Sequence, residues 1–381
     1  MEKVIYFDHA ATTPLDKEVF EKMSPYYTEF FGNADSPHAL GRKAMGAVDC
    51  SRDKIAELIN AQKNEVYFTS GGTEADNWAV LGGARAKRKE GKTHVIVSAI
   101  EHHAVLHAAK TLQEEGFEIT YLPVNEGGRV ELNTLKAALT DNTGLVAIMT
   151  ANNETGVLQP IKEAAVLVRE RGALFFTDAV QAAPYMRLDV KELGVDMLSF
   201  SAHKFYGPKG VGVLYIKNGV KIEKHVGGGE QERGLRGGTV NVPSVVGLAA
   251  AYEKTVQSLE ENNAKIKELS NLFLNELASI TEIKRNGDSD HALPAVLNLQ
   301  IVGVENAALL FNMDMSGVCM AAGSACASAS IKPSHVLTAM GLSDGQAKTC
   351  IRISLGKNNT KEEVLQGVKL LKQTIARLRG E

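Results

Sequence analysis

The sequence predicts an α/β fold in which helices cover both faces of a mainly parallel sheet and a smaller α+β unit follows. Two observations support this prediction. Within residues 65–216, short apolar runs rich in β-branched residues alternate with helical stretches, and this alternation is typical of parallel sheets. A long, charge-rich helical region then precedes a second group of strands and helices. A chain of 381 residues is long enough for two such units, because domains usually contain roughly 100–200 residues.

The first unit begins with the strand EVYFTS at residues 65–70, which leads into a helix near Thr73. The strand HVIVSA at 94–99 and the helix at 101–116 repeat this arrangement. The later elements are the strand LVAIMTA at 145–151, the helix at 161–172, and the strands ALFFTDA, DMLSFSA and VGVLYI at 173–179, 196–202 and 211–216. Ligands of such sheets bind at the carboxyl ends of the strands, so polar residues that follow the strands are candidate site residues.

The second unit follows a helical region at 245–280, which we expect to break near Glu260. Its predicted elements are the strand AVLNLQIVG at 295–303, a helix near Ala307, the loop GSACASAS at 323–330, the strand TCIRISLG at 349–356 and a last amphipathic helix at 360–378. Strands and helices mixed in this way predict an α+β unit.

The composition favours a small-molecule partner. The net charge is −3, from 42 basic and 45 acidic residues, and both signs are interspersed. This balance gives no reason to expect a nucleic-acid or membrane surface. The sequence has no run that resembles a signal peptide and no segment of roughly 20 apolar residues, so we expect a cytoplasmic protein.

The four cysteines are Cys50, Cys319, Cys326 and Cys350. They are too few and too scattered for a disulfide framework, and their spacing does not indicate zinc, so we predict no metal site. We expect Cys50 and Cys319 to be buried structural thiols. Cys326 differs because its neighbours in GSACASAS are too small to cover it. The alternative for Cys326 is a bystander thiol in a small-residue turn.

Two turns that follow predicted strands carry residues suited to a phosphate-bearing cofactor. In SGGTEA, Gly72 and Thr73 open a helix whose free N–H groups suit a phosphate, although an ordinary helix cap by Thr73 is the better explanation when this motif is taken alone. In SFSAHKFYGPKG, Lys204 follows His203 and has hydroxyl groups nearby, a setting that could lower the pKa of its amine. Lys209, in the next turn, fits a solvated charge.

Asp178 ends the strand ALFFTDA and could simply cap the next helix. A pyridoxal phosphate site, however, requires a lysine for a Schiff base and a carboxylate that faces the pyridinium nitrogen. Lys204 and Asp178 supply this pair. The residues therefore point to pyridoxal phosphate as the cofactor.

Ordered blocks of sequence, nearly from end to end, resemble the cysteine desulfurases of the NifS/IscS type, which are class V aminotransferases with the fold-type-I architecture of pyridoxal phosphate enzymes. The blocks are DHAATTP, FGN, TSGGTEADN, EHHAV, NNETG, TDAVQ, SFSAHKFYGPKG, ERGLRGGT, GSACASAS and IRISLG. The resemblance implies a large α/β domain at residues 15–257 with a mainly parallel seven-stranded sheet. It also implies a smaller α+β domain, formed by residues 1–14 and 258–381, which carries the Cys326 loop.

The resemblance implies how the cofactor ring is held. Lys204 would form the Schiff base, Asp178 would pair with the pyridine nitrogen, and Gln181 would bond the ring hydroxyl. His102, in EHHAV, would stack on the ring and shuttle protons, which suits a side chain with an ordinary pKa near 6.5. Metal binding by the neighbouring histidines is a weaker alternative, because no HExxH motif accompanies them.

The resemblance also implies a phosphate site and a homodimer. The phosphate would be bound by Gly72, Thr73, Ser201 and His203. The stretch GGGEQERGLRGGT at 227–239 lacks the GK[ST] ending of a nucleotide-binding loop, and we interpret it as a loop at the edge of the cofactor site. Its Thr239 would reach the phosphate of the neighbouring subunit.

Arg352 would bind the substrate carboxylate through its planar fork of donors, assisted by Asn33 and Asn153. Asn153 is expected near both the amino acid and the cofactor. Without the resemblance, the alternation of Arg352 with Ile351 and Ile353 predicts only a solvated strand face.

The implied activity is removal of sulfur from L-cysteine, which yields L-alanine and a persulfide on Cys326 that passes to an acceptor protein. A selenocysteine lyase of the same family and a non-catalytic scaffold are the alternatives, and the presence of Lys204, His102 and Cys326 speaks against the scaffold. The chain departs from the family pattern at Ala202 and in FGNADSP, and it ends earlier than IscS-type members that dock a scaffold through their tail. The acceptor therefore stays open between iron–sulfur cluster assembly, tRNA thiolation, cofactor synthesis and DNA phosphorothioate modification.

Overall fold

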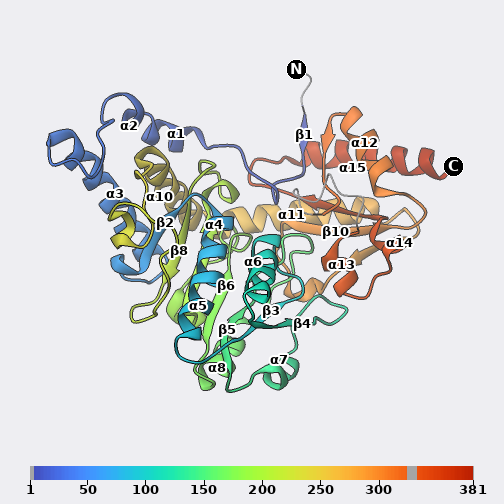
Figure 1. Cartoon of the computed structure of the whole chain (residues 1–381). Coiled ribbons are helices and arrows are strands. Elements are labelled where there is room, and N and C mark those ends of the chain that lie inside the picture. The colour runs from blue at the N-terminus through green and yellow to red at the C-terminus, as the bar shows by residue number, and fades with distance from the viewer. Residues whose placement is uncertain (1–3, 324–332, 381) are drawn as a thin grey trace.

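The computed structural model describes residues 4–323 and 333–380 and has the predicted α/β architecture (Figure 1). The order of strands in its main sheet is β2-β8-β7-β6-β5-β3-β4. β8 is antiparallel to β2 and β7, whereas the other neighbouring strands are parallel. The strands are β2 (Val66–Thr69), β3 (His94–Ser98), β4 (Glu118–Leu122), β5 (Thr143–Ala147), β6 (Leu174–Asp178), β7 (Met197–Ser201) and β8 (Gly212–Ile216). The prediction of a mainly parallel, seven-stranded sheet is therefore confirmed.

All of these strands except β4 are buried at every residue, which explains their continuous apolar sequences. β4 lies at the edge of the sheet and mixes exposed, half-buried and buried residues. Its sequence EITYL lacks a long apolar run, and the sequence analysis missed this strand for that reason.

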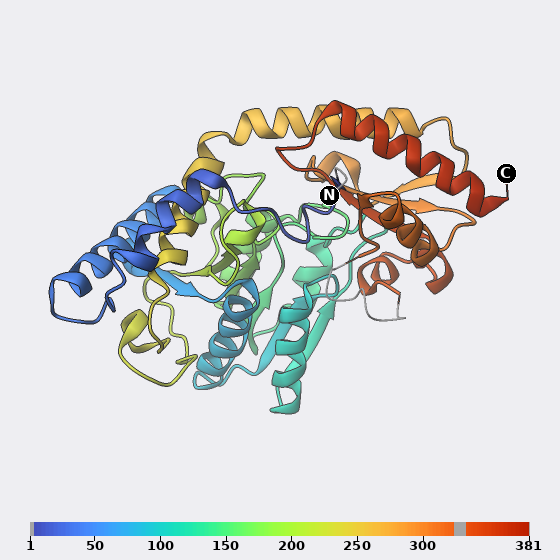
Figure 2. The ribbon, with the colours of Figure 1, turned by 90° about the horizontal axis from the view of Figure 1, so that it is seen from above.

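Helices cover both faces of the main sheet (Figures 1 and 2). In β3, Val95 and Val97 belong to the core of one face, and Ile96 belongs to the core of the other. The first face packs against α4 (Gly72–Asn77), the π-helical turn Trp78–Gly82, α5 (Gly83–Arg88) and α6 (His103–Glu114), and the second against α3 (Ala39–Leu58), α8 (Ile161–Glu170) and α10 (Val242–Gln257). The shorter helices are α1 (Lys17–Met23), α2 (Pro25–Thr28), α7 (Leu132–Ala138) and α9 (Val190–Leu193).

The second unit contains an antiparallel sheet in the order β12-β10-β9, and the parallel pair β1-β11. The strands are β1 (Ile5–Tyr6), β9 (Ile283–Asn286), β10 (Val296–Ile301), β11 (Val318–Cys319) and β12 (Cys350–Ser354). The helices are α11 (Leu259–Leu277), α12 (Asn306–Met315), α13 (His335–Ala339), α14 (Asp344–Ala347) and α15 (Lys361–Arg379). Figure 2 shows the long helices α11 and α15 side by side. Through β1, the N-terminal segment becomes part of this unit and brings Asp8 next to Ser354 of β12.

The helical region between the units breaks at Ser258, close to the predicted break near Glu260. We propose that this break separates the two predicted domains, residues 15–257 and residues 1–14 with 258–381. The contact between the rings of Phe7 and Phe273, whose centroids are 5.8 Å apart, joins the N-terminal segment to α11 in the second unit and supports this division.

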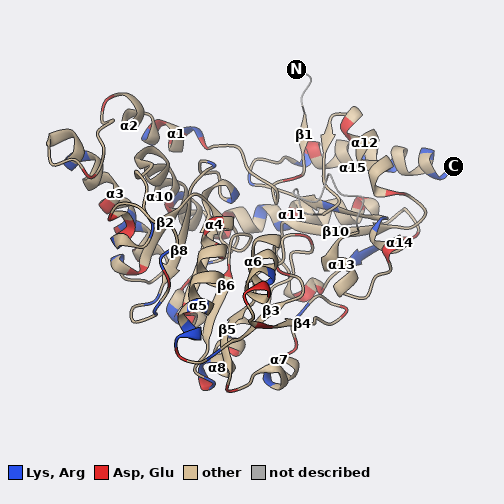
Figure 3. Cartoon of the chain, in the orientation of Figure 1, with Lys and Arg blue, Asp and Glu red and all other residues tan. Residues whose placement is uncertain are grey.

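Cys50 corrects one expectation. It lies on α3 as expected of a helical stretch, but it is exposed, because the buried face of α3 runs through Ala44, Val48 and Ile55. Cys319 is half-buried. Figure 3 shows basic and acidic residues interspersed over both units. In residues 4–323 and 333–380, no helix is long and apolar enough to cross a membrane.

Candidate active site

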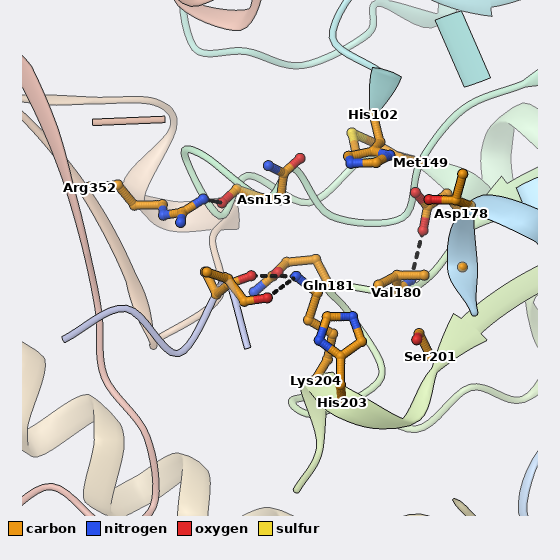
Figure 4. A pocket seen from close by; sticks show the side chains of 14 residues that line it. His102, Met149, Asn153, Asp178, Val180, Gln181, Ser201, His203, Lys204 and Arg352 are labelled. Atoms are coloured by element: carbon orange, nitrogen blue, oxygen red, sulfur yellow. Dashed lines mark hydrogen bonds between the residues drawn. The ribbon is translucent and has the colours of Figure 1, made fainter. Parts of the chain in front are cut away.

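A cavity of about 190 Å³ lies at the carboxyl ends of the central strands β6 and β7, where the two units meet (Figure 4). The predicted residues that line it are Gly72, Thr73, His102, Asn153, Asp178, Gln181, Ser201, His203, Lys204 and Arg352. The fold therefore gathers in one place side chains that are far apart in the sequence.

Asp178, the last residue of β6, forms one end of the cavity. Its Oδ1 accepts a hydrogen bond of 2.8 Å from the Val180 N–H, and its side chain is buried. Burial raises the pKa of Asp178 to about 6, although the Val180 N–H and the nearby Lys204 act in the opposite direction. A cation beside this carboxylate would stabilise its charged form.

Two further buried acids lie near Asp178, and neither was predicted as a site residue. Asp76 of α4 accepts a hydrogen bond of 2.5 Å from Ser199, which is the neighbour of Asp178 across the sheet. Burial, and then the charge of Asp178, raise the pKa of Asp76 well above its ordinary value. Burial also raises the pKa of Glu101, to about 8. Asp76 and Glu101 do not line the cavity themselves, but burial and the charge of Asp178 make it unfavourable to ionise all three carboxyl groups together.

Lys204 lies in the middle of the cavity, in a short turn that follows β7. Its Nζ donates to the carbonyl oxygens of Ala10 at 2.5 Å and of Ala11 at 3.0 Å (Figure 4). These two hydrogen bonds to the N-terminal segment hold the amine in place. The lowered pKa of the Lys204 amine stays a prediction.

His102 faces Lys204 from the opposite side of the cavity in Figure 4. It caps the N-terminus of α6, and its Nδ1 accepts a hydrogen bond from the Ala104 N–H at 3.2 Å. Burial, followed by the charge of Lys204, lowers the pKa of His102 to about 4. The ring is therefore neutral at pH 7 and carries its proton on Nε2, which differs from the ordinary pKa assumed from the sequence.

Arg352 forms the other end of the cavity, and it is not on a solvated face. Its side chain is 1% exposed, its Nη2 donates to Asp8 Oδ1 at 2.7 Å, and its Nη1 donates to the Asn153 carbonyl oxygen at 3.0 Å. The interpretation from strand alternation was wrong because the N-terminal segment covers this face of β12. Asp8 is a site residue that the sequence analysis missed, since only the folded chain brings it to Arg352.

Asn33 and Thr239 do not line this cavity. Asn33 is exposed on the loop before α3, and Thr239 is exposed at the end of the loop 227–239. A hydrogen bond of 2.6 Å from Gln231 Nε2 to Asp35 Oδ2 joins these two loops. The two predicted residues that are missing from the cavity therefore lie on connected loops.

Cys326 lies outside the described residues. Ser334, just after that segment, donates a hydrogen bond of 2.6 Å to Glu154 Oε2. Glu154 directly follows Asn153, whose carbonyl oxygen binds Arg352. The described residues nearest to Cys326 on this side are thus tied to the Arg352 end of the cavity.

The histidines beside the cavity do not form a metal site in the described ranges, where no group of three or more metal-binding side chains is suitably placed. The rings of His103 and His107 lie 5.4 Å apart between centroids, and those of His103 and His335 lie 4.7 Å apart.

The comparisons with known proteins agree with this geometry. The family model for class-V aminotransferases matches residues 5–366. The cysteine desulfurase IscS of Clostridium botulinum is 47% identical over 382 aligned residues, which cover 100% of this chain and 96% of that protein. The chain belongs to the class-V aminotransferase family, in the IscS/NifS group of cysteine desulfurases.

Solved structures share the fold over nearly the whole chain. A NifS-like protein superposes with a TM-score of 0.93 at 36% identity, over 98% of this chain and 100% of that chain. A structure described as SspA in complex with cysteine superposes with a TM-score of 0.83 at 35% identity, over 93% of this chain and 99% of that chain.

The class-V aminotransferase family implies a pyridoxal phosphate cofactor, and the residues of the cavity fit it. Gln181 Oε1 is buried and has no hydrogen-bond partner among the described residues, so it is available to a ligand. A Cβ on Gly72 would come within 2.8 Å of the Val180 side chain, so glycine allows close packing where the phosphate is expected. The acidic end at Asp178 suits a cationic ring.

Proposed function

We propose that this protein is a cysteine desulfurase that binds pyridoxal phosphate and converts L-cysteine to L-alanine and a persulfide on Cys326. The observation that carries the proposal is the arrangement of one cavity, with a buried carboxyl group at Asp178, an amine at Lys204 and a buried guanidinium at Arg352. The similarity to IscS and to the cysteine-bound relative supports the choice of substrate.

The cofactor would lie between His102 and Lys204. Lys204 would hold it covalently, Asp178 would pair with its pyridine nitrogen, and Gln181 would bond the ring hydroxyl. The phosphate ligands would be Gly72, Thr73, Ser201 and His203. When bound, pyridoxal phosphate withdraws electrons from the substrate carbon atoms.

The residues of this chain would then act on the amino acid. The Arg352 fork, held by Asp8 and assisted by Asn153, would bind the substrate carboxylate. The Lys204 amine would remove the Cα proton, and the neutral His102, whose Nδ1 is occupied by the Ala104 N–H, would give the proton on its Nε2 to the substrate carbon.

Sulfur transfer would be the step carried out by Cys326. Its thiolate forms an S–S bond with the substrate sulfur while the substrate Cβ–S bond breaks, and the electron pair of that bond stays with the carbon fragment. Protonation of this fragment gives L-alanine. The persulfide sulfur would pass to an acceptor protein, in iron–sulfur cluster assembly, tRNA thiolation or related sulfur trafficking.

We also propose a homodimer in which Thr239 reaches the phosphate site of the other subunit and Asn33 supports the substrate site. Both residues are exposed and lie on connected loops outside the cavity of their own chain, which supports a role toward a second copy. A cytoplasmic location stays a prediction.

The test is to give purified Cys326→Ala L-cysteine and to measure L-alanine together with the persulfide mass of each cysteine peptide. We expect alanine formation to fall by at least about 10²-fold, because a nucleophile is lost. Cys50→Ala, which removes an exposed thiol on α3, is the matched control and should behave as wild type. Wild-type alanine formation by Cys326→Ala would refute the nucleophile, and preferential turnover of L-selenocysteine would favour the lyase alternative.

A further inference from the structure

The loop 227–239 contains a strained turn. Glu232 has φ 44° and ψ 47°, and Arg233 has φ 57° and ψ 37°. Both angles are in the left-handed region, which residues other than glycine seldom adopt, and here two such residues are consecutive. Such a conformation persists only where the surroundings enforce it, and it is often found at functional sites.

A buried ion pair enforces this turn. Arg52 of α3 donates from Nη1 and Nη2 to the two carboxylate oxygens of Glu232, and both distances are 2.7 Å. The Phe68 N–H adds a third bond to Glu232 at 3.0 Å, and Arg52 Nη1 also donates to the Val66 carbonyl oxygen at 2.7 Å. The side chains of Arg52 and Glu232 are only 10% and 3% exposed. Such a buried bidentate pair fixes orientation more than it adds stability.

The other end of the loop is also clamped. Arg236 donates to both oxygens of Glu74, at 2.8 and 3.1 Å, and Glu74 lies in the first turn of α4 beside the cavity residues Gly72 and Thr73. Just outside the two clamps, the Gly238 N–H donates to Gln231 Oε1 at 3.0 Å and so joins the two ends of the clamped stretch.

The part of the loop that these bonds fix faces outward. Thr239 is exposed, and Gln231 reaches the loop that carries Asn33 through its bond to Asp35. Neither Arg52 nor Glu232 lines the main cavity of its own chain. The clamped structure therefore presents a preformed surface to something outside this chain.

We infer that Arg52 and Glu232 are positioning residues that act across the subunit interface, by fixing the strained turn so that Thr239 enters the cofactor site of the other copy. This inference rests on the proposed function, since it requires the cofactor and the homodimer. If the pair of Arg52 and Glu232 were purely structural, it would stabilise only its own chain. If it acted on the cavity of its own chain, it would do so through Arg236 and Glu74.

Mixed dimers of the holoenzyme distinguish these roles. Glu232→Gln removes the charge of the pair while keeping the size of the side chain. In its homodimer we expect affinity for pyridoxal phosphate, measured from the absorbance of the Lys204-linked cofactor, to fall roughly 10-fold, as the loss of one hydrogen bond to a charged phosphate would give. Glu115→Gln is the matched control, because it breaks a bidentate pair with Arg85 at the surface, and its affinity should not change.

The decisive experiment uses mixed dimers in which one chain carries Lys204→Ala. Only the site of the other chain then gives the absorbance of the Lys204-linked cofactor. When Glu232→Gln is on the chain that keeps Lys204, the loop that enters the remaining site comes from the other chain and is unaltered. Wild-type affinity for pyridoxal phosphate should then return. With Glu232→Gln and Lys204→Ala on the same chain, the remaining site meets an altered loop and should stay weak.

The opposite pattern in the two mixed dimers, or unchanged affinity in the Glu232→Gln homodimer, would overturn the inference. So would a monomeric wild-type protein. If Glu232→Gln does not fold, Arg52→Lys replaces it, because lysine keeps the charge but lacks the fork, and the same pattern should appear with a smaller change. Production of L-alanine by the wild-type dimer is measured separately, so failure of the proposed function is recognised independently of the mixed-dimer result.

Discussion

The two ends of the cavity are built in different ways. The Asp178 end comes from the large sheet and its first helices, and its carboxyl groups at Asp76, Glu101 and Asp178 are buried close together. The Arg352 end comes from β12 of the small sheet and the N-terminal segment, where Arg352 and Asp8 form an ion pair across 344 residues of sequence.

This difference gives each end a charge preference. The acidic end has few cations to balance its carboxyl groups, so a positively charged ring is stabilised there. At the opposite end, Asp8 holds the guanidinium in a fixed orientation for a carboxylate. A molecule that is cationic at one end and anionic at the other, such as the cofactor joined to an amino acid, matches this polarity.

The largest effect is expected from Lys204→Ala, which removes the amine between the two ends. L-Cysteine turnover should fall by about 10²–10⁴-fold from the loss of the proton-transferring group alone, and the absorbance of the linked cofactor should disappear. Lys209→Ala removes an exposed lysine from the adjacent turn and should leave both quantities unchanged. An unchanged spectrum for Lys204→Ala would place the cofactor elsewhere.

The same comparison explains what the sequence could predict. The Asp178 end depends on strands that are buried along their whole length and on polar residues that follow them directly, and both patterns are visible locally. The site residues of β6 and β7 were therefore placed correctly at the carboxyl ends of their strands. Asp76 was not visible, because a polar residue inside a helix gives no sign that it faces a second carboxyl group.

The Arg352 end depends on contacts between distant parts of the chain. Alternation of Arg352 with two isoleucines predicted a solvated face, because the pattern records which side of a strand is apolar and not what covers the other side. The pairing of β1 with β11 brings Asp8 over that side, and a two-residue strand leaves almost no signal in the sequence.

An intermediate effect is expected from Asp8→Asn, which tests the Arg352 end. The amide keeps the size of the side chain but leaves the buried guanidinium without a counter-charge. Because Asp8 is 18% exposed, we expect the free energy of unfolding to fall by about 1–3 kcal/mol, less than for a fully buried pair. Urea unfolding measures this change, and the KM for L-cysteine should rise while the cofactor spectrum is retained.

Asp141→Asn is the control for this prediction, since it removes the charge of a carboxylate that is 96% exposed and pairs with Arg171 at the surface. Its unfolding free energy should stay within about 0.5 kcal/mol of wild type. Equal effects of the two substitutions would mean that the Arg352 end does not depend on its ion pair.

The last prediction is a pH dependence of the free energy of unfolding at the acidic end. Glu101 accepts hydrogen bonds from Ser98 and from the Met149 N–H, and burial raises its pKa from 4.5 to about 8 in the folded protein. The folded state therefore binds the proton more tightly than the unfolded state does. The resulting stabilisation is fully present below pH 4.5 and is lost as the pH rises toward 8, at up to about 1.4 kcal/mol per pH unit.

Glu101→Gln removes this titration because the amide is neutral at every pH. Comparison of holoenzyme unfolding at pH 6 and pH 8 should therefore show a steeper loss of stability for wild type than for the variant, with other titrating groups cancelling in the difference. At pH 6 we expect the variant and wild type to have similar free energies of unfolding, since the amide nitrogen replaces Glu101 Oε2, which has no hydrogen-bond partner among the described residues. Parallel pH profiles for the two proteins would show that Glu101 is ionised in the folded state, and the surplus of buried acid near Asp178 would then be smaller than the structure indicates.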